Sequence, residues 1–275
     1  MKQTEFTLKT REGSGFHAVE WRPDGPAKAV ITLIHGLGEH CQRYAHVADF
    51  FTKSGFALVS SDLPGHGKTK GTRGHGSFPL IRDQIDRLLA EAAARFPGLP
   101  RFIYGHSLGG LLVLDYLIER KPDLKAAIVT SPPIAPAVPV PASKLALARI
   151  MAKLAPSFTL PNGLEQAALS RDPAVIEKYR TDPLVHDRIS ARLGLDLLEG
   201  GPRVQARIRE IELPLLLLQG TGDRISSPLA TAGLASAAGK NVSYRPFEGS
   251  YHELHNEPEK EALFRLELEW LTGKL

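Results

Sequence analysis

Short apolar runs of strand length alternate with longer amphipathic patterns of helix length along most of this chain of 275 residues. Parallel strands need a long crossover connection, which is usually a helix. The pattern therefore predicts an α/β fold with a mostly parallel, eight-stranded sheet flanked by helices. Two N-terminal segments that alternate with period two, Thr4–Thr10 and Phe16–Arg22, predict a hairpin.

The other six strands are expected to be buried on both faces, and five helices are expected between or after them. The strands are expected at Ala29–Ile34, Phe56–Ser61, Arg101–Tyr104, Ala126–Thr130, Pro214–Gln219 and Val242–Phe247. The helices are expected near Tyr44–Lys53, Phe78–Phe96, Ser107–Arg120, Pro228–Ala238 and Glu257–Leu271.

One long segment interrupts this alternation. The stretch SPPIAPAVPVP (131–141) is rich in proline, and no convincing strand follows it before Pro214. An insertion of this size after a core strand predicts a helical cap or lid. We therefore expect a core over 1–132, a cap over 133–205 and the rest of the core over 206–275. The alternative is a helical subdomain that only packs against the core.

Composition and charge exclude several classes of protein. Apolar residues make up 43% and charged residues 23%, which is ordinary for a globular protein and excludes a disordered chain or a fibre. The net charge is only +4 and no five like charges are consecutive, so no nucleic-acid partner is expected. The N-terminus is polar, and no apolar run approaches the roughly 18 residues of a membrane span. The single cysteine, Cys41, excludes an intrachain disulfide framework and fits the cytoplasm, which is the predicted compartment.

A serine is expected to be the nucleophile of an active site. The predicted strand Arg101–Tyr104 leads into Gly105-His106-Ser107-Leu108-Gly109, and a helix follows. In the pattern G-x-S-x-G between a strand and a helix, the glycines permit a sharp turn that exposes the serine hydroxyl. The helix N-terminus also favours a developing negative charge. Ser107 is therefore the predicted nucleophile, and the alternative is a purely structural turn.

The chain also carries an acid and a base in the order that this fold requires. A serine hydroxyl needs a base to take its proton, and the base needs an orienting acid. Asp223 follows the predicted strand Pro214–Gln219, and His252 follows the last predicted strand. His255 is the competing candidate for the base, but it is expected in or near the start of the last helix.

Two backbone amides are expected to form the oxyanion hole. The strand over 29–34 ends in His35-Gly36-Leu37-Gly38, and H-G-x-G at this position supplies a backbone N–H to the oxyanion. We expect the amides of Leu37 and Leu108 to act there. His66, in Asp62-Leu63-Pro64-Gly65-His66-Gly67, is assigned to a structural loop by the order of the elements.

Neither a metal nor a cofactor is predicted from motif spacing. The ten histidines show no pattern such as H-E-x-x-H, and the chain has neither G-x-x-x-x-G-K-[ST] nor G-x-G-x-x-G after the first strand.

The motifs together resemble those of the monoacylglycerol lipase group (monoglyceride lipase and lysophospholipase-like proteins) within the α/β-hydrolases. The similar segments are, in order, HGLGEH, DLPGHGKT, GHSLGG, LSRDPAVIEKYRTDPL, LLLQGTGDR and FEGSYHELHNEPE. The resemblance implies the triad Ser107, Asp223 and His252 and the oxyanion amides of Leu37 and Leu108. It also implies a polar group around the glycerol headgroup, consisting of Glu39, Arg43, His106 and Tyr179.

The alternatives without substrate contact are a structural ion pair for Glu39 and Arg43, and packing within the cap for Tyr179. The family often has Ala at the position of Leu37 and Met at that of Leu108, which leaves their backbone roles intact and predicts a narrower pocket mouth.

A basic amphipathic helix is expected within the predicted cap. In Ala142–Ala155, the side chains of Leu147, Ile150, Met151 and Leu154 share one helical face, with Arg149 and Lys153 opposite. Such a helix can lie in a membrane interface. It can equally pack its apolar face on the core or on a second subunit, and both alternatives stay open here.

The leading functional hypothesis is a serine hydrolase that cleaves monoacylglycerols to glycerol and fatty acid through an acyl-enzyme. The expected partner is the lipid substrate, with transient membrane or micelle contact through the cap. The alternatives are a general carboxylesterase or lysophospholipase, a peptidase of the proline-iminopeptidase type, and a non-catalytic binding protein on the hydrolase fold. The sequence predicts no oligomeric state.

Overall fold

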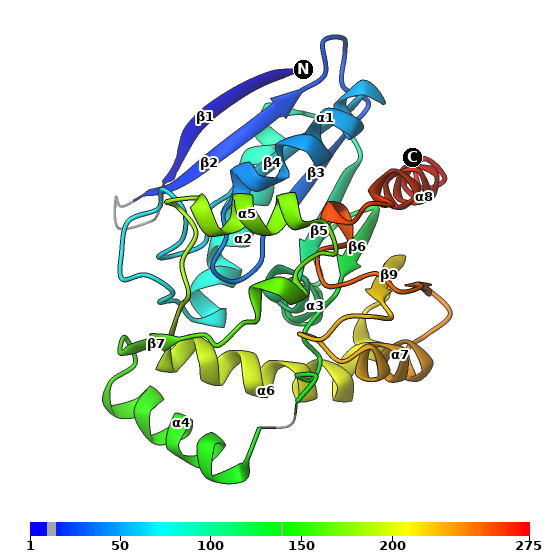
Figure 1. Ribbon diagram of the computed structural model, residues 1–275. Helices are drawn as coiled ribbons and strands as arrows, with labels where there is room; N and C mark the ends of the chain where they lie inside the picture. The colour runs from blue at the N-terminus through cyan, green and yellow to red at the C-terminus, as the bar shows by residue number, and fades with distance from the viewer. Residues whose placement is uncertain (10–14, 139) are drawn as a thin grey trace.

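The computed structural model describes residues 1–9, 15–138 and 140–275. One eight-stranded sheet has the order β1-β2-β4-β3-β5-β6-β9-β10 (Figure 1). The strand β1 (Lys2–Lys9) pairs antiparallel with β2 (Gly15–Arg22), which is antiparallel to β4, and the other neighbouring pairs are parallel. The remaining strands of this sheet are β3 (Ala29–Ile34), β4 (Phe56–Ser61), β5 (Arg101–His106), β6 (Ala126–Thr130), β9 (Leu215–Gly220) and β10 (Val242–Phe247).

The predicted eight-stranded, mostly parallel sheet is confirmed, including its N-terminal hairpin; Thr10 lies outside the described residues. One detail was wrong, because β10 is not buried on both faces. Its residues are half-buried or exposed, since β10 forms the edge of the sheet and pairs only with β9.

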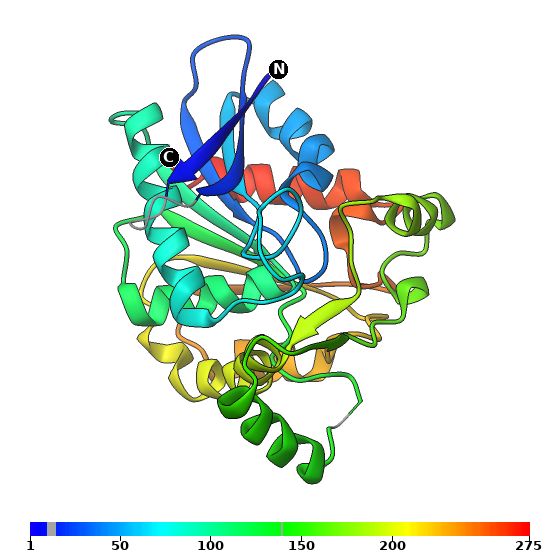
Figure 2. The same cartoon turned by 90° about the vertical axis from the view of Figure 1, so that its left-hand side faces the viewer.

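Helices cover both faces of the sheet, as Figures 1 and 2 show from two directions. The helices α1 (Ala45–Lys53) and α8 (Lys260–Thr272) cover one face, and α2 (Phe78–Arg95), α3 (Leu108–Arg120) and α7 (Pro228–Ala237) cover the other. Within β3, Ile31 packs into the cluster that includes α1 and α8, while Val30 packs into the opposite cluster. Alternating side chains of a buried strand thus anchor both helical layers, which is why the strands are almost continuously apolar.

The chain between β6 and β9 leaves this sandwich. It contains α4 (Ala142–Leu154), β7 (Thr159–Pro161), η2 (Gln166–Ala168), α5 (Pro173–Thr181), β8 (Arg188–Ser190), α6 (Ala191–Arg207) and η3 (Ile208–Glu210), where η marks a 3₁₀ helix. The expectation of helices and loops alone was wrong, because β7 and β8 form a small antiparallel sheet. Strands of three residues are too short to show an alternating pattern.

The helix α4 lies at the outside of the molecule, against α6 (Figure 1). Ala152 of α4 is buried, whereas Leu147, Ile150 and Leu154 are 59%, 54% and 79% exposed. The alternative in which this apolar face packs on the chain's own core was therefore wrong. In the part of the chain that the structure describes, no helix combines the length and apolar character needed to cross a membrane.

Candidate active site

Ser107 occupies a sharp turn between β5 and α3. Its backbone angles are φ 52° and ψ −123°, a left-handed conformation that costs a non-glycine residue free energy. A Cβ added at Gly105 would collide with the carbonyl of Gly109, and one added at Gly109 would collide with the carbonyl of Ile34. The two glycines thus allow α3 to approach the sheet closely, and the strained turn presents the Ser107 hydroxyl at the carboxyl edge of the sheet.

His252 and Asp223 lie beside this serine although they are far from it in sequence. Nε2 of His252 is 2.8 Å from Oγ of Ser107, and Nδ1 of His252 is 2.8 Å from Oδ2 of Asp223. Asp223 follows β9 and His252 follows β10, so parallel neighbours deliver both side chains to the same edge. The geometry allows His252 to accept the serine proton while Asp223 orients the imidazole.

Four donors hold the Asp223 carboxylate in place. Oδ1 accepts hydrogen bonds from the amides of Ile225 (2.8 Å) and Ser226 (3.0 Å), and Oδ2 accepts one from the side-chain amide of Gln219 (2.7 Å) as well as facing His252. Burial alone would raise the pKa of this carboxyl, but His252 and the amide donors outweigh burial and lower the pKa. The carboxylate therefore stays ionised at neutral pH and can stabilise an imidazolium.

The pKa of His252 moves in the opposite direction. Burial of the ring lowers the pKa, but the adjacent Asp223 carboxylate, with Glu253 and Glu39 nearby, raises it above its ordinary value of 6.5. His252 is thus a stronger base than a free histidine.

The competing histidines do not reach the serine. His255 lies in η4 (Leu254–Asn256), fully buried and stacked on Tyr44 with ring centroids 4.7 Å apart. Neither of its ring nitrogens has a hydrogen-bond partner among the described residues. His66 is buried in the loop after β4, where its Nδ1 lies 2.8 Å from the Pro64 carbonyl. Both positions suit a structural role.

The amides predicted for the oxyanion hole come from two different loops. Leu37 follows β3, and Leu108 is the first residue of α3 directly after Ser107. Within residues 1–9, 15–138 and 140–275, neither amide is paired with an acceptor. The two amides thus remain available to a developing oxyanion.

Glu39 and Arg43 form a buried ion-pair cluster with a residue that the sequence did not single out, Glu253. Arg43 Nη1 donates to Oε2 of Glu39 (2.6 Å), and its two terminal nitrogens donate to Glu253 at 2.8 and 2.9 Å. Oε1 of Glu39 accepts from the Gly36 amide (2.6 Å) and the Tyr44 hydroxyl (2.7 Å). The structural ion pair is therefore formed, and it fixes the loop that carries Leu37.

The other two predicted headgroup residues occupy different surroundings. Tyr179, on α5, is buried with the Arg43 guanidinium 4.8 Å from its ring centroid. None of the hydrogen bonds in the described residues uses its hydroxyl, which therefore remains available. His106 is buried beneath the triad, with Nδ1 2.9 Å from the Thr130 hydroxyl and its ring centroid 5.1 Å from that of His252.

Sequence reasoning missed Glu253 and Gln219. Glu253 directly follows His252, but nothing in YHELH indicates that its carboxylate turns toward an arginine 210 positions earlier. Gln219 is the penultimate residue of β9, and its amide joins Asp223 to Thr231, whose hydroxyl donates to Oε1 of Gln219 at 3.0 Å. The only available signal was a polar residue at the end of an otherwise apolar strand.

Comparisons with known proteins cover the whole fold. A hydrolase family described as "Serine aminopeptidase, S33" matches residues 25–259. A "Monoacylglycerol lipase" of Mycolicibacterium smegmatis is 32% identical, over 93% of this chain and 92% of that protein. An uncharacterized abhydrolase domain-containing protein of Dictyostelium discoideum is 35% identical over 100% of this chain, which spans only 30% of that protein. The crystal structure of Paleococcus ferrophilus monoacylglycerol lipase has a TM-score of 0.88 and 35% identity, with 94% of this chain and 99% of that chain covered.

Proposed function

The chain belongs to the serine aminopeptidase S33 family of α/β-hydrolases, and we propose that it is a serine hydrolase that cleaves monoacylglycerols to glycerol and fatty acid. The observation that carries the proposal is the continuous chain of 2.8 Å contacts from Ser107 through His252 to Asp223. The similarity to two monoacylglycerol lipases, at 32% and 35% identity, supports the substrate class.

The proposed reaction has two stages. Ser107 Oγ attacks the ester carbonyl while His252 Nε2 takes its proton, and the amides of Leu37 and Leu108 stabilise the oxyanion. The imidazolium, stabilised by Asp223, then protonates the departing glycerol oxygen and leaves an acyl-enzyme. His252 next takes a proton from water, whose attack on the acyl carbon releases the fatty acid and regenerates the serine.

The headgroup selectivity rests on fewer groups than the sequence suggested. Glu39 and Arg43 satisfy each other and Glu253, so we assign them to positioning the oxyanion loop. The Tyr179 hydroxyl remains for a glycerol hydroxyl, and the His106 ring lies beside that of His252. A second acyl chain would replace a hydroxyl and leave a buried donor unpaired, at about 1–3 kcal/mol.

Residues 133–205 are proposed as a cap over the triad. The cap is tied to the base loop, because the amide of Glu253 donates to the carbonyl of Leu169 at 2.7 Å. It is also tied to the oxyanion loop, because the amide of His186 donates to the carbonyl of Gly38 at 2.9 Å. A substrate held under these contacts would be shielded from bulk water.

The outer face of this cap is proposed to contact lipid. Leu147, Ile150 and Leu154 of α4 are exposed together, Lys153 is an exposed cation on the same helix, and Arg149 is paired with Glu199 at 2.9 Å. An exposed apolar stripe on a helix that also carries a basic side chain favours a membrane interface. The cytoplasmic location stays a prediction from the sequence.

The test of the activity uses a panel of substrates with matched acyl chains in detergent. We expect turnover of monoacylglycerol to exceed that of di- and triacylglycerol by about tenfold or more, because an unpaired buried donor costs about that factor. Ser107→Ala should lower kcat by about 10⁴–10⁶-fold while the protein stays folded. A preferred lysophospholipid would favour the lysophospholipase alternative, and a preferred aminoacyl amide the peptidase. Equal or better turnover of triacylglycerol would refute the headgroup pocket.

The membrane contact has a separate test with vesicles that contain phosphatidylglycerol. The triple variant Leu147→Ser, Ile150→Ser and Leu154→Ser should bind vesicles at least about tenfold more weakly, since each side chain loses about 1.5–3 kcal/mol of apolar burial. Its turnover of a short, dissolved ester should stay unchanged. Leu229→Ser is the matched control, because Leu229 is 85% exposed on α7. Unchanged vesicle binding, or a dimer that only the triple variant disrupts, would contradict the lipid contact.

A further inference from the structure

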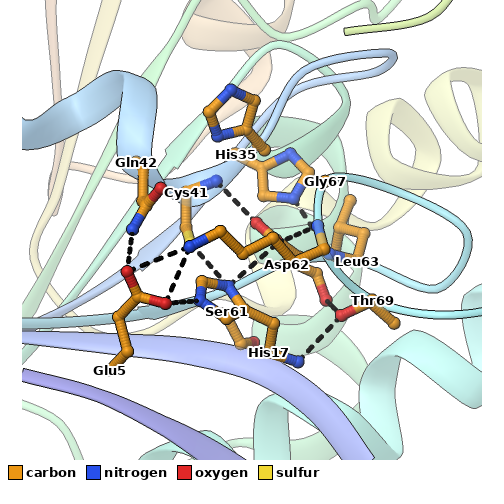
Figure 3. A network of polar contacts seen from close by, with 12 residues as sticks. Glu5, His17, His35, Cys41, Gln42, Ser61, Asp62, Leu63, Gly67 and Thr69 are labelled. Carbon is orange, nitrogen blue, oxygen red and sulfur yellow. Dashed lines mark hydrogen bonds and ion pairs between the residues drawn. The ribbon is translucent and has the colours of Figure 1, made fainter. Parts of the chain in front are cut away.

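Three side chains with metal-binding chemistry meet beside β2 (Figure 3). They are His17 on β2, Cys41 at the start of η1 (Cys41–Tyr44) and Asp62 directly after β4. One donor atom from each lies within 4.8 Å of the other two, and this is the only such group among the described residues. His17 Nδ1 is 3.0 Å from Asp62 Oδ2 and 3.8 Å from Cys41 Sγ. The positions 17, 41 and 62 have no metal-binding spacing, so the sequence alone could not reveal the group.

The separations approach those of a tetrahedral metal centre. Zinc binds sulfur at about 2.3 Å and nitrogen or oxygen at about 2.0–2.2 Å, which places its ligand atoms about 3.3–3.8 Å from one another. The separation of 3.8 Å between Cys41 and His17 lies at the upper end of that range, and the hydrogen-bond distance of 3.0 Å between His17 and Asp62 is slightly shorter than the range. All three donor atoms lie within 4.8 Å of one another, so side-chain adjustments of about 1 Å or less would bring them to the separations of a zinc centre.

Neighbouring groups already orient the His17 imidazole and the Asp62 carboxylate. Nε2 of His17 is 2.8 Å from Oε2 of Glu5, which is the carboxylate–histidine pairing that fixes a metal-binding ring and its tautomer. Oδ1 of Asp62 accepts from the Cys41 amide at 2.9 Å and leaves Oδ2 directed at His17. The ammonium of Lys68, the nearby cation, is bound to Glu5 at 2.8 Å rather than to Asp62.

The backbone is also shaped around this carboxylate. Gly67 has φ +51°, and a Cβ at that position would collide with the Asp62 carboxylate. The amide of Lys68 donates to Asp62 Oδ2 at 2.8 Å. The loop after β4 thus wraps Asp62 closely, and the ligand is held by the fold before any ion binds.

We propose that His17 Nδ1, Cys41 Sγ and Asp62 Oδ2 form a zinc site with a water as the fourth ligand. A nitrogen, a thiolate and a carboxylate suit the borderline-soft Zn²⁺ ion and not Mg²⁺ or Ca²⁺, which prefer oxygen ligands alone. The ion replaces the hydrogen between His17 and Asp62, and binding releases the thiol proton of Cys41 and the Nδ1 proton of His17 to solvent. The side chain of His17 is 13% exposed, which gives the ion a path from solvent.

A bound ion would join three segments that support the proposed active site. Cys41 lies two residues before Arg43 in η1, and Asp62 precedes Leu63, whose amide donates to Nε2 of His35 at 2.9 Å. His35 begins the loop that carries the oxyanion amide of Leu37. The role assigned to the ion is therefore structural, and it is independent of the substrate.

The experiment replaces zinc with Co²⁺, whose bond to a thiolate gives a charge-transfer band in the near ultraviolet. Cys41 is the only cysteine of the chain, so such a band reports this site and no other. The whole, metal-free protein should bind one Co²⁺ with a thiolate band, and stoichiometric Zn²⁺ should remove it. Cys41→Ser should abolish the band. Glu5→Gln should weaken Co²⁺ binding by about 10–100-fold, because the carboxylate that orients His17 is lost.

Two controls keep the result interpretable. Glu269→Gln removes an exposed carboxylate on α8 and should leave the band and its affinity unchanged. Circular dichroism should show that Cys41→Ser is folded; if it is not, Glu5→Gln, which alters a partly exposed side chain, carries the comparison. Absence of a thiolate band at millimolar Co²⁺ in the folded protein would overturn the proposal. Co²⁺ binding that Glu5→Gln leaves unchanged would overturn it equally.

Discussion

Glu267 is the most informative residue for a test of stability, because it is a carboxyl in the apolar core. It lies on the inner face of α8, fully buried, and neither oxygen has a hydrogen-bond partner of good geometry among the described residues. Burial raises its pKa from an ordinary 4.5 to about 8, and the nearby Tyr104 hydroxyl offsets this only in part. Folding at neutral pH must therefore protonate Glu267.

The size and sign of this cost follow from the two pKa values. The unfolded chain releases the proton above pH 4.5 and the folded chain keeps it up to about pH 8, so stability falls as pH rises between these values and is constant above them. At pH 7 the solution is about 2.5 pH units above the unfolded pKa, and each unit costs about 1.36 kcal/mol. Glu267→Gln, which keeps the shape and carries no proton to titrate, should stabilise the protein by about 3 kcal/mol at pH 7. At pH 5 the gain should be only about 1 kcal/mol.

Urea unfolding between pH 5 and pH 8.5 measures the prediction. The free-energy difference between Glu267→Gln and the wild type should rise with pH and reach a plateau above about pH 8. Glu269→Gln, on the exposed face of the same helix, is the matched control and should show no such rise. A difference that does not change with pH, or a variant less stable than the wild type at pH 7, would refute a buried neutral carboxyl.

Three further predictions concern the proposed active site. His252→Ala should lower kcat by about 10⁴-fold or more while His255→Ala lowers it far less, and the reverse order in folded variants would move the base to His255. As pH falls, kcat/KM should begin to decline with an apparent pKa above 6.5, because the raised pKa of His252 makes it accept a proton earlier; an inflection below 6.5 would contradict this. Arg43→Met should destabilise the protein by about 3–5 kcal/mol or more, since it leaves the buried carboxylates of Glu39 and Glu253 facing each other without a cation. Glu253→Gln should cost less, because Arg43 and Glu39 remain paired, and equal urea midpoints for the two variants would argue against a structural role for Arg43.

The sequence predicted what depends on local pattern and on the order of elements. The strand–turn–helix around Ser107 is visible in five residues, because only glycine at both flanking positions lets the chain approach the sheet so closely. Asp223 and His252 follow from the same logic, since the ends of parallel strands meet at one edge. The buried parallel strands were found because they are nearly continuous apolar runs, and the N-terminal hairpin was found from its period-two alternation.

Contacts between distant segments stayed invisible. No pattern joins Arg43 to Glu253 or His17 to Cys41, because each pair comes together only through the packing of separate elements. The direction of the α4 stripe was also undetermined, since a helical wheel gives the width of an apolar face but not what covers it. β7 and β8 were missed because a strand of three residues carries too little periodicity.

The buried cluster of Glu39, Arg43 and Glu253 joins residues that local motifs indicated to one that only the packing of distant segments reveals. Glu39 holds the Gly36 amide at 2.6 Å, and thereby fixes the loop that carries Leu37. Glu253 directly follows His252, so Arg43 ties the loop of the proposed oxyanion hole to the loop of the proposed base. Such a link suits a reaction in which proton transfer and oxyanion stabilisation occur in the same transition state. The base and the oxyanion amide must then keep a fixed position relative to each other. We therefore propose that Glu39 and Arg43, which resembled headgroup residues in the sequence, support the catalytic geometry instead.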